Sequence, residues 1–221
     1  VDVLVTGGVH GSEPAGACAA TQLLTDHYRH IDSRIRLTVI PCVNPHGYET
    51  ATLKNETGVN VNREFKIPPG CPESALVQMY LEQLGIRFHL TIDLHEDDPK
   101  DVRAVEQDMP FPNGFYLYEV CADHSRRVGR HVVDIVRRQG FSICDFATID
   151  GDTCTDGVVW YPEGCANPVY AAGTTLEGFL YLHYTEQALT TETPTTWPLA
   201  NRIKVQLWAV EAALNQMRLN K

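Results

Sequence analysis

The sequence predicts an α/β fold: a single domain in which a sheet is covered by helices on both faces. First, a chain of 221 residues is long enough for one well-buried domain and short of two ordinary ones. Second, strand-like apolar runs alternate with segments of helical spacing, which is typical of α/β proteins. Third, three long loops hold most of the unusual polar residues, and loops of this length are uncommon unless they form a site.

The first 72 residues contain three of these elements and one long loop, in order. Residues 1–8 are an apolar run that ends in a glycine turn, which predicts a buried strand. Pro14 suits a first helical turn, and residues 15–28 have helical spacing. Residues 35–43 predict a second strand, and the Pro-, Gly- and Asn-rich residues 44–72 predict an irregular loop.

The rest of the chain continues the alternation. We expect helices over 72–84, 121–139 and 201–219, and strands over 88–94, 114–118 and 187–191. A long loop follows His95, and the Gly-, Asp- and Thr-rich residues 147–175 form another. Both His10 and His95 come just after a predicted strand, and sites in open α/β sheets gather at the carboxyl ends of strands.

The composition argues against two classes of partner. Lys and Arg total 18 against 28 Asp and Glu, a formal net charge of −10, and no basic run occurs. Such a surface repels phosphate backbones, so we expect no nucleic-acid partner. No apolar stretch approaches the length of a membrane span, so we expect no membrane partner either. The oligomeric state is left open.

The cysteines bear on the redox compartment. Their number is odd and no Cys-x-x-Cys pair occurs, which disfavours a disulfide framework and a thiolate metal site. We interpret them as buried free thiols, with Cys18 and Cys42 inside predicted core elements, and predict a cytoplasmic location. They are Cys18, Cys42, Cys71, Cys121, Cys144, Cys154 and Cys165.

A candidate metal site combines a local pair of ligands with a remote one. His10 and Glu13 lie three positions apart at a strand-to-helix turn, and His95 follows an apolar strand. Hydrolytic zinc takes nitrogen and oxygen ligands, three from the protein, and keeps a fourth position open. Asp93 or Glu96 would orient the ring of His95. Either half of this site alone is a weak signal, because His10 would equally well cap a helix.

Four further motifs follow His10-x-x-Glu13 in a characteristic order. They are Asn-Pro-x-Gly at 44–47, Gly-Val-x-x-Asn-Arg-x-Phe at 58–65, Asp-x-His at 93–95 and Thr-x-Glu at 190–192. Together they resemble the zinc metallocarboxypeptidases, in the superfamily that also holds succinylglutamate desuccinylase and aspartoacylase. The resemblance implies a mixed, mostly parallel twisted sheet and a catalytic domain over residues 1–221. Because the chain opens inside a strand without a Met, we expect a truncated N-terminus.

The resemblance implies a role for each motif. His10, Glu13 and His95 would hold one Zn²⁺ per chain. Asn62 and Arg63 would grip the terminal carboxylate of a substrate, a task that suits the planar fork of arginine. A surface ion pair of Arg63 with Glu64 or Glu56 is the alternative.

The family also uses a glutamate as general base and a tyrosine upstream of it. We predict Glu192 as the base, because it ends a strand-like run that leads to the terminal helix, with Glu177, which we expect in a glycine-flanked loop, as the rival. Tyr170 is the predicted tyrosine, with Tyr161 as its rival. Glu177 would instead line the pocket for the last side chain of the substrate and favour a cationic one.

One departure from the family concerns the arginine that polarises the scissile carbonyl. Between Glu13 and Arg63 the only arginines are those at 29, 34 and 36, on a predicted helix or strand. Lys54 lies in the loop and is the predicted substitute, although it offers a point charge rather than a fork.

The predicted function is therefore a zinc-dependent metallocarboxypeptidase that hydrolyses an amide bond near a free carboxylate. A desuccinylase- or aspartoacylase-like enzyme acting on small N-acyl amino acids is the nearest alternative. Asn55 stands where that branch has an arginine, and the branch lacks the Thr-Glu-Thr-Pro run of 191–194. Two further candidate functions are a cell-wall peptide amidase and a non-catalytic binding module.

Overall fold

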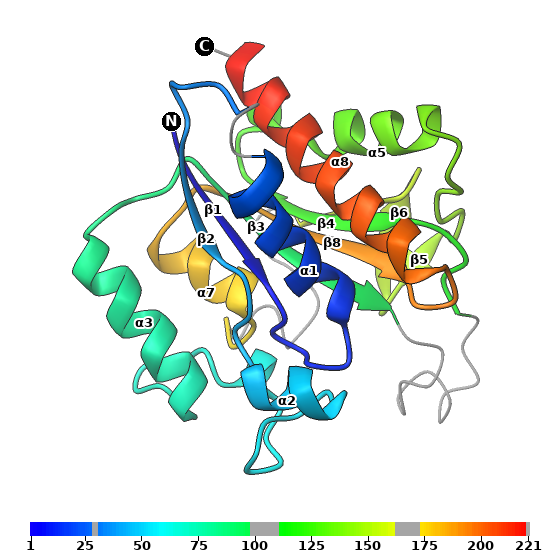
Figure 1. Ribbon diagram of the computed structural model, residues 1–221. Coiled ribbons are helices and arrows are strands. Elements are labelled where there is room, and N and C mark those ends of the chain that lie inside the picture. The colour runs from blue at the N-terminus through cyan, green and yellow to red at the C-terminus, as the bar shows by residue number, and fades with distance from the viewer. Residues whose placement is uncertain (28–30, 98–110, 162–172, 220–221) are drawn as a thin grey trace.

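The computed structural model describes residues 1–27, 31–97, 111–161 and 173–219. Its centre is one eight-stranded sheet of order β2-β1-β3-β8-β4-β7-β6-β5, drawn in Figure 1. The strands are β1 (Asp2–Gly7), β2 (Arg36–Ile40), β3 (Leu90–Asp97), β4 (Tyr116–Cys121), β5 (Thr148–Ile149), β6 (Asp152–Thr155), β7 (Val158–Tyr161) and β8 (Gln187–Pro194). The α-helices are α1 (Pro14–Gln22), α2 (Pro45–Thr50), α3 (Pro72–Leu84), α5 (Gly129–Arg138), α7 (Leu176–His183) and α8 (Leu199–Leu219).

The sheet is mixed and mostly parallel, which confirms the predicted fold class. β1 pairs in parallel with β2 and β3, β3 with β8, and β4 with β7. Antiparallel pairing joins β4 to β8, and joins β6 to both β7 and β5. The three neighbouring strands β1, β3 and β8 therefore end at the same edge of the sheet.

Helices cover both faces, as expected from strands whose successive side chains point to opposite sides. α1, α5 and α8 form a layer on one face, in front of the strands in Figure 1. Val3 and Val5 of β1 pack into this layer, together with the apolar residues of those helices. Leu4 points to the other face and packs in a second cluster with residues of α3 and α7.

Glycines allow α1 to lie unusually close to the sheet. A Cβ on Gly16 of α1 would lie 2.2 Å from the carbonyl oxygen of Leu94 in β3. A Cβ on Gly7 of β1 would lie 2.6 Å from the carbonyl oxygen of Gly16. Since α1 follows the 10–13 loop directly, this close approach sets the distance between that loop and β3.

Several predicted boundaries were wrong. β3 does not end before His95 but continues to Asp97, because β8 supplies pairing partners as far as Pro194. The strand predicted over 35–43 is shorter, and the helix predicted over 121–139 begins only at Gly129. The cause of the second error is that β4 continues to Cys121, which pairs with β8. The helices predicted over 15–28, 72–84 and 201–219 correspond to α1 with a π-helical turn over 23–27, to α3 and to α8.

Two predicted loops contain regular structure. Residues 147–175 include β5, β6 and β7, joined by the tight turns Asp150-Gly151 and Asp156-Gly157. All four turn residues have positive φ, between 51° and 86°, which is the conformation that Asp-Gly favours in hairpins. Residues 44–72 include α2, whose first turn is capped by Asn44 accepting from the Gly47 N–H, and a 3₁₀ turn over 61–63.

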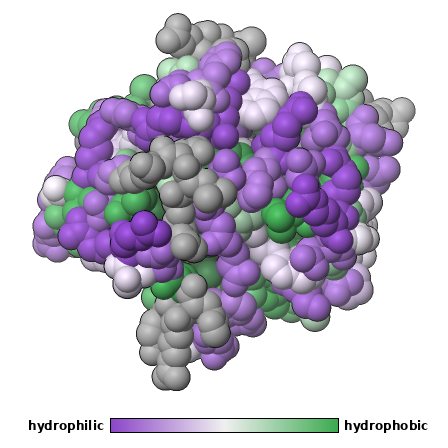
Figure 2. All heavy atoms as spheres, turned by 90° about the horizontal axis from the view of Figure 1, so that it is seen from above, coloured by the Kyte–Doolittle hydropathy of each residue, from purple (hydrophilic) through white to green (hydrophobic). Residues whose placement is uncertain are grey.

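The surface and the cysteines agree in part with expectation. Hydrophilic residues predominate on the face shown in Figure 2, with scattered apolar ones. None of the helices in the described ranges is long and apolar enough to cross a membrane. The six described cysteines are free, but Cys18 and Cys42 are only half-buried, so their placement in the core was wrong. Cys165 lies outside the described residues, and the cytoplasmic location stays a prediction.

Candidate metal centre

The candidate centre lies where the strand order changes direction. From β1 the chain passes through α1 to β2 on one side and then returns to β3 on the other. Such a switch point opens a crevice at the carboxyl ends of the two strands. The loop after β1 supplies His10 and Glu13, and the end of β3 supplies His95. Gly7 pairs with Leu94, so the loop begins level with His95.

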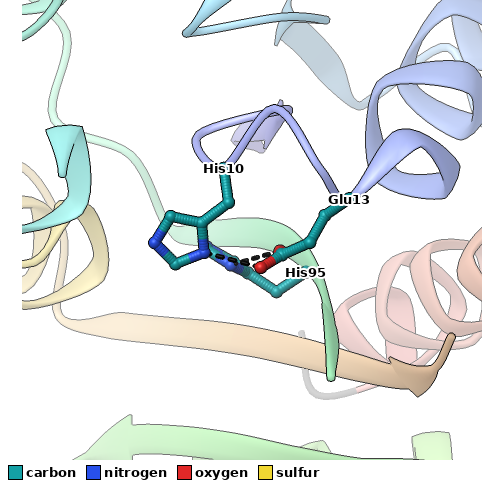
Figure 3. A group of neighbouring side chains, drawn as sticks. All are labelled: His10, Glu13 and His95. Atoms are coloured by element: carbon teal, nitrogen blue, oxygen red, sulfur yellow. Dashed lines mark hydrogen bonds and ion pairs between the residues drawn. The ribbon is translucent and has the colours of Figure 1, made fainter. Parts of the chain in front are cut away.

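The structure brings these three side chains together, as Figure 3 shows. His10 Nδ1 lies 2.6 Å from Glu13 Oε1, and His95 Nδ1 lies 2.9 Å from Glu13 Oε2. One ligand atom from each residue lies within 4.8 Å of the others, and all three residues are buried. Two imidazole nitrogens and a carboxylate oxygen are the donor set of a hydrolytic metal site, so the residues present fit a divalent metal such as zinc.

The outer ring nitrogens hold each imidazole in the orientation that such a site needs. His95 Nε2 lies 2.8 Å from Asp93 Oδ2, and His10 Nε2 lies 3.2 Å from Asn60 Oδ1. Asn60 Oδ1 also accepts from the Asn62 N–H at 3.0 Å, so it faces His10 as an acceptor. Both outer nitrogens therefore donate, which leaves the lone pair of each Nδ1 for a metal.

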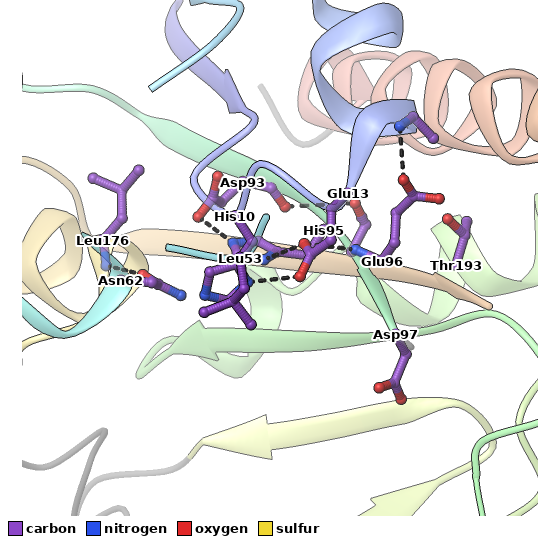
Figure 4. Close-up of polar contacts among 12 residues, drawn as sticks. His10, Glu13, Leu53, Asn62, Asp93, His95, Glu96, Asp97, Leu176 and Thr193 are labelled. Carbon is purple, nitrogen blue, oxygen red and sulfur yellow. Dashed lines mark hydrogen bonds and ion pairs between the residues drawn. The ribbon is translucent and has the colours of Figure 1, made fainter. Parts of the chain in front are cut away.

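Asp93 and Glu96 were both candidates for orienting His95, and the structure distinguishes them. Asp93 reaches the ring and is itself held by Thr6, whose hydroxyl donates to Asp93 Oδ1 at 2.6 Å. Glu96 contacts Glu13 through its backbone N–H, at 3.0 Å from Oε2, and its side chain points away toward α1 in Figure 4.

Charge is concentrated in this buried cluster. Burial alone would raise the pKa of Glu13, but the charges and hydrogen bonds of His10 and His95 lower it far below its usual value. Burial would lower the pKa of His95, yet Asp93 and Glu13 raise it well above the usual value. The buried carboxylates therefore require positive charge between them, and a metal ion bound at the Nδ1 atoms would supply it in place of protons.

Glu192 lies directly beside the cluster, on β8. It pairs in register with His95, so both side chains are on the same face of the sheet. Its Oε2 is buried and has no hydrogen-bond partner within the described ranges. Burial raises the pKa of Glu192 well above its usual value; the charge of His95 opposes this, and those of Glu13, Asp97 and Asp150 add to it.

Glu177 occupies a helix rather than the predicted glycine-flanked loop. It lies in the first turn of α7, which begins after the capping residue Thr175, and it is buried. Burial raises the pKa of Glu177 well above its usual value, against a hydrogen bond from Thr190. Its Oε1 has no partner in the part of the chain that the structure describes.

The predicted substrate-binding residues fall on the loop between β2 and α3. Asn62 is buried, and its Oδ1 accepts from the Leu176 N–H at 2.8 Å, which ties this loop to the start of α7 (Figure 4). Arg63 is half-buried and donates from Nη1 to the Asn62 carbonyl at 2.7 Å. Lys54 is exposed. The roles of all three stay predictions.

Of the two candidate tyrosines, only Tyr161 lies within the described residues. Tyr170 lies outside the described residues. Its rival Tyr161 belongs to β7, donates to Asp152 Oδ2 at 2.9 Å and stacks on Tyr118, which indicates a packing role. Burial raises the pKa of Tyr118 well above its usual value, and nearby charges that include that of Glu192 add to this, so these rings approach Glu192. We did not predict from the sequence that Tyr116 and Tyr118 lie near the site, although the Tyr-x-Tyr spacing at 116–118 places two rings on one face of a strand.

Comparison with known proteins places this site in context. The family model of the succinylglutamate desuccinylase/aspartoacylase catalytic domain matches residues 1–100. The matched segment includes His10, Glu13, Asn62, Arg63 and His95 and ends before α7 and β8. No curated protein matched the chain by sequence.

Three solved structures share the fold. A candidate metallopeptidase from Shewanella amazonensis is 24% identical, with a TM-score of 0.74 over 98% of this chain and 77% of that one. A metallo-carboxypeptidase from Burkholderia cenocepacia is 15% identical, with a TM-score of 0.65 over 99% and 57%. The D,L-carboxypeptidase Csd4 from Helicobacter pylori, in its mDAP-bound form, is 15% identical, with a TM-score of 0.66 over 98% and 51%.

The fold and the cluster thus define an α/β protein with a His-Glu-His site at the carboxyl ends of its strands. The matching family model and these structures support the zinc carboxypeptidase-like superfamily, as the order of the sequence motifs predicted.

Proposed function

We propose that the protein is a zinc-dependent metallocarboxypeptidase that hydrolyses a peptide bond next to a free carboxylate terminus. The observation that carries the proposal is the position of Glu192. The half-buried Glu192, whose Oε2 is buried and has no hydrogen-bond partner among the described residues, lies one strand away from a converging His-Glu-His donor set. A metal site with only a structural purpose has no need of such a neighbour, whereas a hydrolase needs a base there.

In this proposal each residue has a distinct task. Zinc held by His10, Glu13 and His95 would polarise the scissile carbonyl and lower the pKa of a water molecule. Glu192 accepts the proton of the attacking water and returns it to the leaving amine. Arg63 binds the terminal carboxylate of the substrate, so cleavage occurs next to a chain end. Lys54 is exposed and would approach the carbonyl oxygen only as a point charge.

The direct test is turnover by the metal-stripped protein before and after zinc is restored. We expect zinc to restore cleavage of peptides with a free C-terminus, including one that ends in diaminopimelate. Csd4 has been solved with mDAP and with a tripeptide, which motivates that substrate. Zinc-dependent cleavage of N-acyl amino acids alone would instead support a desuccinylase or aspartoacylase activity, which the family model also fits. No turnover of any substrate would favour a binding module.

A second expectation concerns the side chain of the last residue. Burial is the main cause that raises the pKa of Glu177, the charges of Asp93 and Glu119 add to it and that of His95 opposes it, so a cationic side chain nearby would stabilise its charged form. We expect Glu177 to favour peptides that end in Lys over those that end in Ala or Phe. Glu177→Gln should reduce this preference roughly tenfold or more, because close charge pairs contribute on the order of 1.5 kcal/mol upward. The measurement is kcat/KM for the three peptides. An unchanged ratio in the variant would show that Glu177 does not contact the substrate.

A further inference from the structure

A buried ion pair links the metal centre to the C-terminal helix. Arg202 of α8 donates from Nη1 to Glu96 Oε1, and the side chain of Glu96 is fully covered. Glu96 follows His95 in β3, but its side chain points to the opposite face of the sheet, toward α1 and α8. None of the proposed catalytic tasks uses this pair.

Glu96 contacts both ends of the segment Glu13-Pro14-Ala15. Its backbone N–H donates to Glu13 Oε2 at 3.0 Å, and its Oε2 accepts from the Ala15 N–H at 2.7 Å. Glu13 is the N-cap residue of α1, yet its side chain forms no capping hydrogen bond. Since Pro14 has no N–H, Ala15 offers the first donor of the helix, and an N-cap side chain would ordinarily help to satisfy such donors. Glu96 caps the helix in place of Glu13, so the Glu13 carboxylate is available to contact His10 and His95.

The buried carboxylate of Glu96 needs a positive charge beside it. A carboxylate as deeply buried as that of Glu96 is costly unless it is paired, and leaving such a charge without its partner is strongly destabilising. Arg202 supplies the charge from a helix more than 100 residues away in sequence (|i−j| = 106). α8 also reaches β3 through Gln206, whose Nε2 donates to the His95 carbonyl at 2.7 Å.

We infer that Glu96 and Arg202 are positioning residues for the metal ligand Glu13: they fix the start of α1 against β3 and so hold the carboxylate between His10 and His95. The inference rests on the proposed zinc site. It assigns a role in metal affinity to α8, a helix that contributes no ligand.

Two double variants test the positioning role without leaving a buried charge. Glu96→Gln/Arg202→Met keeps a carbonyl oxygen that accepts from the Ala15 N–H, whereas Glu96→Leu/Arg202→Met removes the acceptor. Zinc affinity is measured on the metal-stripped proteins by competition with a chromophoric chelator, and thermal unfolding of the same metal-free proteins is followed in parallel. We expect the Gln variant to bind zinc as tightly as wild type and the Leu variant to bind roughly 10–100-fold more weakly, as for other losses around metal ligands.

The single variant Arg202→Met should also weaken zinc binding, and Arg137→Met is its matched control. Arg137 pairs with Asp134 and Asp156 on the exposed side of α5, so its loss should leave the affinity unchanged. Equal affinity in the two double variants, with only the unfolding temperature changed, would overturn the positioning role. Absence of zinc binding in wild type would overturn the proposed function instead, so the two failures are distinguishable.

Discussion

Glu192→Gln is expected to lower kcat by roughly 10²–10⁴ on every peptide, the size that general-base loss has in other enzymes. The amide keeps the shape of the carboxylate but cannot accept the proton of the attacking water. The loss should be uniform, because proton transfer does not depend on the side chain in the specificity pocket. The metal ligands are untouched, so zinc content should stay at the wild-type level. The measurement is kcat for peptides that end in Lys, Ala and Phe, with zinc determined on the same samples.

Glu177→Gln is the matched control for this experiment. Glu177 is a buried glutamate near His95, and its Oε1 has no hydrogen-bond partner in the described part of the chain, so it is the rival for the role of base. We expect its substitution to change only the preference among the three peptides. A uniform collapse of kcat in Glu177→Gln, with Glu192→Gln still active, would mean that the two roles are exchanged.

Arg63→Ala is expected to cost on the order of 2–5 kcal/mol in transition-state binding, the range for losing one partner of a buried charge pair. The cost should appear in kcat/KM for peptides with a free C-terminus. Amidation removes the carboxylate that the guanidinium is proposed to bind. It should therefore reduce kcat/KM of the wild type far more than that of the variant.

Lys66→Ala serves as the control for Arg63→Ala. Lys66 is a nearby cation that pairs with Glu64 at 2.7 Å, at the surface of the same loop, and we expect no effect of its loss on the amidation penalty. If amidation reduces kcat/KM equally in the wild type and in Arg63→Ala, then Arg63 has some other task.

The parts of the site that could be predicted from sequence are those that short motifs specify. His10 and Glu13 are three residues apart at a strand end, and His95 follows an apolar run that predicts a strand. Parallel pairing of β1 with β3 then brings the three candidate ligands together, whatever the conformation of the long loops. The terminal helix was equally predictable, because its helical spacing continues over most of its 21 residues.

The features that were not predicted from the sequence depend mostly on how the strands and helices pack together. Glu177 falls in a predicted loop because the eight residues of α7 are too few to show a clear period. The roles of Asp93 and Glu96 were not separated, because the predicted strand ended at Leu94. The strand continues to Asp97, and alternation along it places Asp93 on the side of His95 and Glu96 on the opposite side. By contrast, the hairpins at Asp150 and Asp156 were missed although Asp-Gly is a strong local signal.

Zinc content of histidine variants tests the account most directly. The wild type should bind about one zinc per chain. His10→Ala and His95→Ala should each abolish binding while circular dichroism shows an intact fold, and His124→Ala, at an exposed histidine of the turn over 124–126, should bind as the wild type does. Full zinc occupancy in a His10→Ala/His95→Ala double variant would contradict the assignment of the metal centre, and with it the proposed hydrolase.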